Sequence, residues 1–544
     1  MKQVHETLDR ILPEIIAMSE DIYRHPELGF KEFRTREKTI EALDKAGIPH
    51  EDVAYTGIRA VLDSGKPGPN IGLITEFDAV PTFGHPYASE DSYAAHTCGH
   101  YGQLGVMMSL FLAIKESGML KDLCGKVTLL VTPAEEFCDM DYRKELIREG
   151  KISHPSGKQE MIATGVFDDV DLMLSCHAMG IDMTKYHAEI GSSLNGFIMK
   201  RAIFTGKAAH AGANPEGGVN ALNAVNLAMT GINFLRETFR ADDAIRVHFF
   251  VPEGGQSVNT IPARTQLEMY VRAKTVPAIF ETNAKVTRAI RAGALAINCD
   301  LEIQDTPGYF PLHQDENLTA LVKKHILDYI DESMIAQGTH GFASGDMGDL
   351  SLMWPIVEIG VAGFEGSIHG KDFKTVDPEQ AYCVPAHYFA DTVIDLLSDG
   401  GASAWKIKEA FQPVMNKENY LETREGKLLP VKHCVQGSHG WALYGKTAQA
   451  LADCGAKGID KPAFGIDCGD PAVLAVLPER ADRIELVGLV SNICVVSNAV
   501  VLQSRYPEAR IVVDAALTAS FDPKLHGEVL DVLEGLQVEV LNRA

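Results

Sequence analysis

The sequence lacks the features of a membrane protein and of a nucleic-acid-binding protein. No stretch approaches 18 uninterrupted apolar residues, and the polar N-terminal segment does not read as a signal peptide. Basic residues are few, because 50 Lys and Arg face 74 Asp and Glu and leave a formal net charge of −24. This charge opposes binding to the phosphate backbone of nucleic acids and to anionic membranes. We therefore expect a cytoplasmic protein that has neither of these as a partner.

The sequence also lacks a disulfide framework, internal repeats and low-complexity tracts. Its 10 cysteines are spread through 544 residues without short spacings, which predicts reduced thiols. The length exceeds what one hydrophobic core usually accommodates, so two to four domains are expected. These features favour a multidomain enzyme.

Polar side chains follow several predicted strands at the point where each apolar run stops. They are Asp78 after strand 71–77, Glu135 and Glu136 after strand 126–132, His177 after strand 171–176, and His369 after strand 357–361. An apolar helix is predicted over 105–114, which gives a β-α-β unit and an α/β fold class. Because open α/β sheets bind ligands at the carboxyl ends of their strands, we expect these side chains to converge.

The remaining sequence predicts two further parts. Residues 191–305 change to alternating strands around a helix over 217–236, which is typical of an inserted α+β domain. The catalytic domain would then comprise 1–190 and 306–398. A linker is predicted over 399–415, where apolar periodicity lapses and Gly, Ser and Pro accumulate. A last α/β module is predicted over 416–544, with strands at 483–489 and 510–513.

The motif His96-Thr-Cys-Gly-His100, followed by Pro133-Ala-Glu-Glu136, supplies the ligand types that a divalent transition metal prefers. Two neighbouring metal ions would lower the pKa of bound water and polarise an amide carbonyl. The proposed ligands are a bridging Cys98 thiolate, the imidazoles of His100 and His177, and the Glu136 carboxylate. Glu135 is left to carry the proton as general base and acid. A single histidine or a Glu pair is more often structural, but their concentration here favours a metal site.

Residues 5–398 resemble the amidohydrolase branch of the aminoacylase and carboxypeptidase-type metallopeptidase superfamily, which cleaves N-acyl and aminobenzoyl amino acids. Further motifs that carry the resemblance are Phe77-Asp-Ala-Val-Pro81, Ala209-His-Ala211, Asn259-Thr-Ile-Pro262 and Ile368-His369. The resemblance implies metal ligands at Cys98, His100, Glu136, His177 and His369, with Glu135 as the catalytic acid and base and Asp78 supporting the ligands. It implies two divalent metal ions in each protomer, Mn or Zn, with Co or Ni as alternatives.

The same resemblance identifies the inserted domain as a lid and dimerisation domain. It implies a homodimer in which His210 reaches the site of the neighbouring protomer and stabilises the oxyanion. Asn259 and Arg272 match positions near polar groups of the substrate, although an Arg at a strand end is as often a surface ion pair. Gly345-Asp346-Met347 resembles the aminobenzoyl-glutamate hydrolase subgroup.

Three segments of the last module, Asn419-Tyr-Leu-Glu-Thr-Arg-Glu-Gly-Lys427, Pro430-Val-Lys-His-Cys434 and Gly488-Leu-Val-Ser-Asn-Ile-Cys-Val495, carry a second resemblance. Through them residues 416–544 resemble cysteine hydrolases related to nicotinamidase and isochorismatase. Cys494 matches the nucleophile and Lys461 its lysine partner, and a helix start would favour the thiolate. The family's first strand, with its catalytic Asp, has no counterpart. Val414 and Asn416 stand where relatives carry a metal-binding Asp and His, and only His433 of that site is left. We therefore expect a truncated, catalytically incomplete module, and a buried small side chain is the alternative interpretation of Cys494.

Together these features predict a metal-dependent amidohydrolase that acts on a small amide substrate with a carboxylate, such as an N-acyl or aminobenzoyl amino acid or a dipeptide. Two alternatives stay open. One is a bifunctional or cysteine-dependent amidase that uses Cys494. The other is a non-catalytic interaction protein whose last module recruits a partner.

Overall fold

The computed structural model describes residues 2–424, 445–458, 465–466, 468–469, 471–520 and 522–543. The chain divides into two compact units, residues 1–431 and 432–544. Among the described helices, none is long and apolar enough to cross a membrane.

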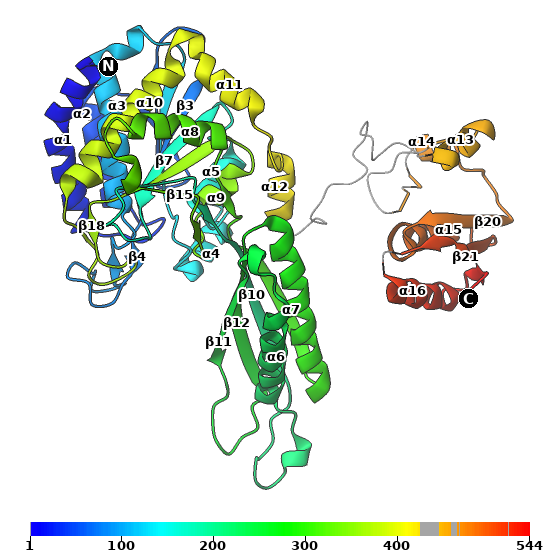
Figure 1. The fold of residues 1–544 in the computed structure, drawn as a ribbon. Coiled ribbons are helices and arrows are strands. Elements are labelled where there is room, and N and C mark those ends of the chain that lie inside the picture. The colour runs from blue at the N-terminus through cyan, green and yellow to red at the C-terminus, as the bar shows by residue number, and fades with distance from the viewer. Residues whose placement is uncertain are drawn as a thin grey trace. The chain divides into compact units, whose positions relative to one another are not determined.

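A mixed eight-stranded sheet forms the centre of the first unit (Figure 1). In spatial order its strands are β1 (His50–Val53), β2 (Gly57–Asp63), β6 (Lys126–Thr132), β3 (Asn70–Glu76), β7 (Leu172–Ala178), β17 (Ile356–Val361), β8 (Ala188–Ile190) and β15 (Ile335–Gln337). β6, β3, β7 and β17 run parallel, so their carboxyl ends lie at one edge of the sheet. β3 is buried at every position, as expected for a parallel strand covered on both faces.

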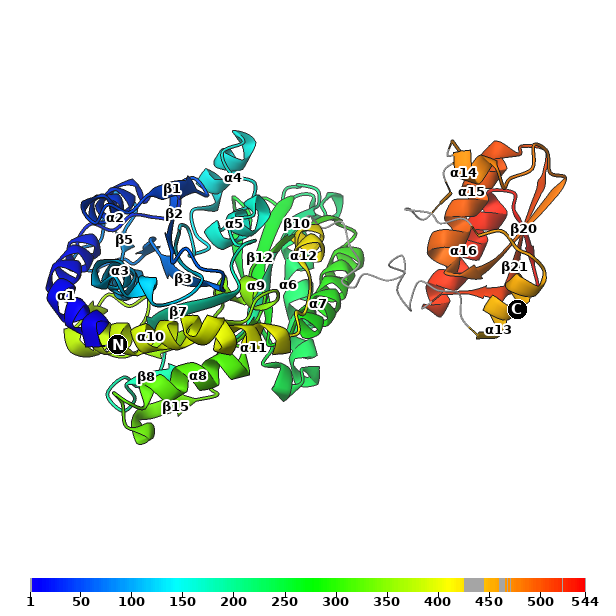
Figure 2. The same ribbon diagram turned by 90° about the horizontal axis from the view of Figure 1, so that it is seen from above.

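Helices cover both faces of this sheet (Figures 1 and 2). One face packs on α1 (Lys2–Tyr23), α3 (His100–Ser117), α8 (Glu316–Ile326) and α10 (Val384–Leu397). The other packs on α5 (Gly157–Thr164) and α9 (Met347–Ser351). α2 (Phe33–Lys45) and α4 (Met140–Arg148) lie at the periphery. α3 is apolar around most of its circumference, which explains why it runs through the protein interior.

Short strands also lie in the loops of the first unit. They are β4 (Val80–Pro81), β5 (Ala94–Ala95), β9 (Ser193–Leu194), β14 (Leu312–His313), β16 (His340–Gly341), β18 (Phe364–Glu365) and β19 (Lys374–Thr375). β16 pairs with β9, which pairs in turn with β14, so three distant loops are joined there.

The inserted segment forms a four-stranded antiparallel sheet with two helices on one face, as Figure 1 shows. Its strands, in spatial order, are β11 (Arg246–Glu253), β12 (Arg264–Ala273), β10 (Gly196–Thr205) and β13 (Asp300–Pro307). The helices are α6 (Ala221–Leu235) and α7 (Val276–Ile297), which share one apolar cluster with the sheet. β12 alternates between buried and half-buried residues, because only one face is covered.

The segment expected to be a linker, 399–415, differs from the structure. It contains the helix α11 (Ala402–Ala410), whose Ala404 and Ile407 are buried in the main core. The next helix, α12 (Lys417–Arg424), also packs on the first unit, because the fully buried Tyr420 lies against the Phe310 ring at 5.9 Å. The boundary between the units therefore follows residue 431 instead of 415. The glycine and proline residues that suggested a linker lie instead in turns between packed helices.

The described part of the second unit is a three-stranded parallel sheet with helices. The strands are β20 (Arg483–Leu489), β21 (Arg510–Ala519) and β22 (Glu539–Leu541), and the helices are α13 (Gly445–Asp453), α14 (Pro471–Leu474), α15 (Val496–Arg505) and α16 (Pro523–Gly535). α15 and α16 contribute Leu502 and Leu533 to a core that the central strand β21 completes with Val513.

Candidate metal centre

The candidate metal donors converge at the carboxyl edge of the first unit's sheet. Glu136 lies in the loop after β6, and His177 is the next-to-last residue of β7. His100 is the first residue of α3, and Cys98 lies two residues before it. Gly99 between them has φ +95°, and a Cβ there would lie 2.8 Å from the Ala178 side chain. Glycine is therefore required for this close turn.

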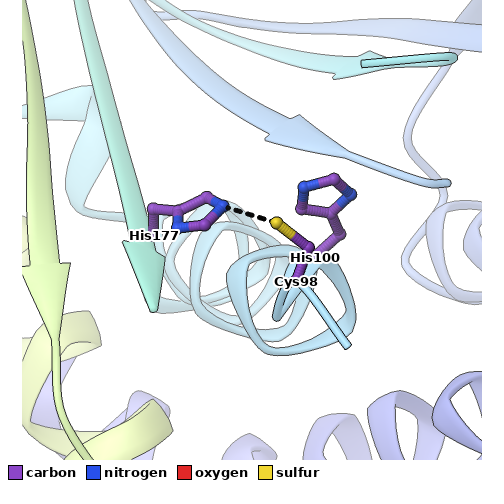
Figure 3. Close-up of side chains that lie close together, drawn as sticks. All are labelled: Cys98, His100 and His177. Carbon is purple, nitrogen blue, oxygen red and sulfur yellow. Dashed lines mark hydrogen bonds between the residues drawn. The ribbon is translucent and has the colours of Figure 1, made fainter. Parts of the chain in front are cut away.

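Three overlapping groups of side chains have ligand atoms within 4.8 Å of one another. They are Cys98, His100 and His177; Cys98, Glu136 and His369; and His100, Glu135 and Glu136. The Cys98 sulfur lies 3.4 Å from His177 Nε2. Figure 3 shows this sulfur between the imidazoles of His100 and His177. Cys98, His100 and Glu136 each belong to two of the groups, so the three groups form one connected cluster of donors.

Backbone and carboxylate contacts orient these ligands. His100 Nδ1 lies 2.8 Å from the Asp78 carbonyl and His177 Nδ1 2.8 Å from the Ala178 carbonyl, so both Nε2 atoms are free to face the other donors. The Asp78 carboxylate accepts the Glu136 backbone N–H at 2.9 Å. Asp78 thus holds two of the donor loops together, as such outer contacts commonly do in metal sites.

The donors fit a divalent transition metal. His100 Nε2 and Glu136 Oε1 are buried without a well-aligned hydrogen bond among the described residues. They lie 3.2 Å from Glu76 and 2.9 Å from His369, respectively. Burial raises the pKa of the Cys98 thiol well above its ordinary value, and the Glu136 carboxylate adds to the rise. A cation in this place would compensate the buried charges and take the thiol as thiolate.

Glu135 lies beside the donors and also lines the cavity. Its backbone carbonyl accepts the Tyr309 hydroxyl, and its carboxylate accepts the Asp346 backbone N–H at 3.4 Å. Burial raises the pKa of Glu135 well above its ordinary value, and the Glu136 and Asp346 carboxylates raise it further. A carboxyl with a raised pKa is suited to take and return a proton near neutral pH.

A buried ionic network lies beneath Glu135 that was not expected from the sequence. Lys158 is fully buried and pairs with both Glu76 and Asp346, and Ser156 donates to Asp346 at 2.6 Å. The sequence could have indicated Glu76, because an acidic residue at the end of an apolar strand is unusual. Nothing in the sequence indicated that Lys158 is buried, since a lysine on a short helix is usually exposed.

A cavity of about 610 Å³ opens beside the donors. Besides the donors, its lining includes Glu189, Glu358 and loop residues 339–345. Arg272, on the inserted sheet, donates to Ser344 Oγ at 3.1 Å and so lies next to this wall. Its guanidinium also lies over the Tyr270 ring at 5.2 Å, which fixes its orientation.

His210 and Asn259 lie away from this cavity. Both are exposed, in loops beyond the ends of β10 and β12 that are remote from Arg272. Each strand has ten residues, so its two ends are about 30 Å apart. His210 Nδ1 accepts the backbone N–H groups of Gly212 and Ala213 at 3.1 and 3.0 Å. The fold therefore does not bring His210 to the metal donors of its own chain.

In the second unit, Cys494 lies in the π-helical turn Ser491–Val495, between β20 and α15. This is the strand-to-helix position that its sequence predicts. Ser491 Oγ lies 2.9 Å from His526 Nδ1, a pair that was not expected from the sequence. Lys461 and His433 lie outside the described residues. Val414 and Asn416 belong to the first unit, where the Val414 N–H binds the Leu352 carbonyl at 2.8 Å and Asn416 caps α12.

Comparison with known families and proteins gives one family match and several distant relatives. The model of peptidase family M20/M25/M40 matches residues 72–395. A mouse Xaa-Arg dipeptidase is 27% identical over 65% of this chain and 78% of its own. The indole-3-acetyl-aspartic acid hydrolase of Enterobacter agglomerans is 27% identical over 51% of this chain and 70% of its own. One polypeptide of the p-aminobenzoyl-glutamate hydrolase of Escherichia coli is 26% identical over 50% of this chain and 69% of its own.

Solved structures share the fold of the first unit. A putative aminohydrolase from methicillin-resistant Staphylococcus aureus has a TM-score of 0.61 and 23% identity, and the match covers 73% of this chain and all of that one. A protein of Bacillus subtilis described as a dinuclear metal-binding peptidase of the M20 family has a TM-score of 0.56 and 19% identity, over 72% of this chain and 99% of its own.

Proposed function

The chain belongs to peptidase family M20/M25/M40, and on this premise we propose that it hydrolyses the amide bond of an N-acyl or aminobenzoyl amino acid or of a dipeptide. Its relatives are amide hydrolases, so the enzyme class follows from the family. The observation that carries the proposal is the convergence of thiol, imidazole and carboxylate donors beside a cavity.

We assign Cys98, His100, Glu136, His177 and His369 as ligands of two divalent ions, Mn or Zn, with Co or Ni as alternatives. The bound ions would supply an activated water and polarise the substrate carbonyl. Asp78 keeps His100 and Glu136 in place through the contacts described above. Glu135 takes the proton at its carboxylate and returns it to the leaving nitrogen.

Arg272 is our candidate for the substrate carboxylate. Its guanidinium already lies beside Ser344 in the cavity wall, and a guanidinium binds a carboxylate through two parallel hydrogen bonds. An amino-acid carboxylate held there would leave the adjacent amide directed toward the donors.

A homodimer is the second part of the proposal. His210 and Asn259 lie at the remote end of the inserted sheet, too far to act on their own chain's cavity. Exposed apolar side chains on that segment, among them Phe234 and Phe250, fit an interface. In this arrangement His210 stabilises the oxyanion in the neighbouring protomer.

For the second unit we propose a catalytically incomplete relative of cysteine hydrolases. The position of Cys494 before α15 supports the resemblance. The helix α12 and residues 414–416 belong to the first unit and pack on it. They are therefore not available to complete the catalytic site of the second unit.

The test is a hydrolysis screen on one metal-analysed preparation with aminobenzoyl-glutamate, acyl-amino acids and dipeptides. Activity that is lost with a chelator and kept in Cys494→Ser supports the proposal. Activity that survives the chelator and is lost in Cys494→Ser favours the cysteine-dependent amidase, and no activity on any substrate favours an interaction protein.

A further inference from the structure

The cavity extends past the metal donors to an acidic wall that the mechanism above does not use. Glu189 on β8 and Glu358 on β17 both line it. Gly360 pairs with His177 on one side and with Glu189 on the other, so these three residues share one level of the sheet. Because neighbouring strands are about 4.8 Å apart, Glu189 lies roughly 10 Å from His177 along the cavity floor.

Neither carboxylate forms an ion pair with a Lys, Arg or His among the described residues. Glu189 is only 9% exposed, and one of its oxygens accepts the Thr339 hydroxyl. No described residue donates a hydrogen bond to the other oxygen, Oε2. None of the residues that line the cavity is Lys or Arg, and Arg272 contacts only Ser344 and Phe342 of this lining. Burial raises the pKa of Glu189. Burial and the nearby Glu76 carboxylate raise the pKa of Glu358 to about 8, although Lys158 opposes this rise.

The floor between His177 and Glu189 is kept open by a glycine. A Cβ at Gly360 would lie 2.7 Å from the Glu189 Cβ and 3.1 Å from Glu189 Oε2. Any side chain at this position would therefore push against Glu189 and fill the passage from the donors to its carboxylate. A substrate chain is able to occupy that passage instead.

We propose that Glu189 binds a positively charged group of the substrate, an ammonium or a guanidinium, while the scissile amide lies at the metal donors. This inference rests on the proposed function. The flexible stem of a lysine- or arginine-like side chain spans the separation. A cation there would compensate a buried carboxylate that otherwise lacks a partner. Glu358 lies on the same face, two residues before Gly360 on β17, and adds a second carboxyl group to the wall.

The experiment compares the metal-loaded enzyme on dipeptides of arginine and of citrulline, its neutral isostere, with the residue placed on either side of the amide. We expect kcat/KM to be about tenfold or more higher for arginine in at least one of the two series, because a hydrogen-bonded charge is lost with citrulline. Glu189→Gln should bring the arginine rate down toward that of citrulline. Glu365→Gln, an exposed acid on β18, should keep the wild-type ratio.

Equal rates for arginine and citrulline in both series overturn the inference while leaving amide hydrolysis intact. A Glu189→Gln enzyme that keeps the full preference for arginine also overturns it. The wild-type comparison decides the question even if the variant does not fold. Failure to hydrolyse any amide would instead contradict the proposed function, and the inference with it.

Discussion

Glu135 is the residue whose replacement separates proton transfer from metal binding. Its carboxylate lies beside the donors, and its neighbour Glu136 is the assigned ligand. Glu135→Gln keeps the size of the side chain but removes the proton acceptor. We expect bound metal to be retained and kcat to fall about 10²- to 10⁴-fold, measured by elemental analysis and steady-state kinetics.

The matched control for Glu135 is Glu145→Gln, which removes an exposed carboxylate on α4. It should keep both metal and rate. Near-normal turnover in Glu135→Gln would remove Glu135 from the catalytic role, and loss of metal together with activity would make it a ligand.

Lys158 gives a prediction about stability. Its ammonium pairs with the buried Glu76 and Asp346, so Lys158→Met leaves two carboxylates without their cation. Breaking a buried ion pair in this way costs about 3–5 kcal/mol, and we expect the urea midpoint to fall accordingly. Lys144→Met, on the exposed face of α4, should leave the midpoint unchanged. Equal midpoints for both variants would contradict the importance of the network.

A site residue could be predicted when its chemistry is visible in a short sequence motif, and it was missed when only the packing of distant elements brings it to the site. Cys98, His100, Glu135 and Glu136 are concentrated in two short motifs, so their chemistry is visible without coordinates. The partners of Glu135 were not visible, because Lys158 and Asp346 come together only through the packing of α5 against α9. Glu189 was missed for the same reason, since its relation to His177 passes through two strand pairings.

Among the elements, α1 and α10 are joined by a buried carboxylate that makes stability depend on pH. Asp391 binds His5 at 2.9 Å and accepts the Tyr329 hydroxyl at 2.7 Å. Burial alone would raise the pKa of Asp391, but the hydrogen bonds from His5 and Tyr329 hold it below its ordinary value. Its contribution is therefore present above the unfolded carboxyl pKa and is lost as the pH falls through the lower folded pKa.

Asp391→Asn should lower the free energy of unfolding by about 2 kcal/mol at pH 7. The difference from wild type should shrink as the pH falls below about 4, near the pKa of an unfolded aspartate. Urea titrations across this range measure it. Asp9→Asn, which removes a carboxylate that is 70% exposed, serves as control. A difference that grows on acidification would reverse the assigned sign.

Helices and strands could be predicted where the spacing of apolar residues fits either a helix or a strand and not both. The strands expected at 126–132 and 483–489 have the same bounds in the structure, and the inserted helix expected over 217–236 runs from Ala221 to Leu235. The expected linker was the exception. Its apolar residues are few, and α11 and α12 are held by their packing on the first unit, which sequence composition does not reveal.

On the scale of the whole molecule, the proposed homodimer predicts complementation between two inactive variants. If His210 acts in the neighbouring protomer, then a heterodimer of Glu135→Gln with His210→Ala contains one complete site. Mixing the two proteins under conditions of protomer exchange should give each heterodimer up to about half of the activity of a wild-type dimer, because one of its two sites is complete. Lys207→Ala, in the same exposed loop, should be active without mixing. A mixture that stays inactive despite exchange would contradict action between protomers.

The proposed function requires that the convergent donors bind metal and that amide hydrolysis depends on this metal. The decisive measurement is a titration of metal-stripped protein with Mn²⁺ or Zn²⁺ in which bound metal and the rate of acyl-amino-acid hydrolysis are followed together. We predict two ions bound per chain, with activity that is absent in the stripped protein and rises with occupancy. Full activity in the stripped protein, or no metal bound by a folded chain, would contradict a metal-dependent hydrolase.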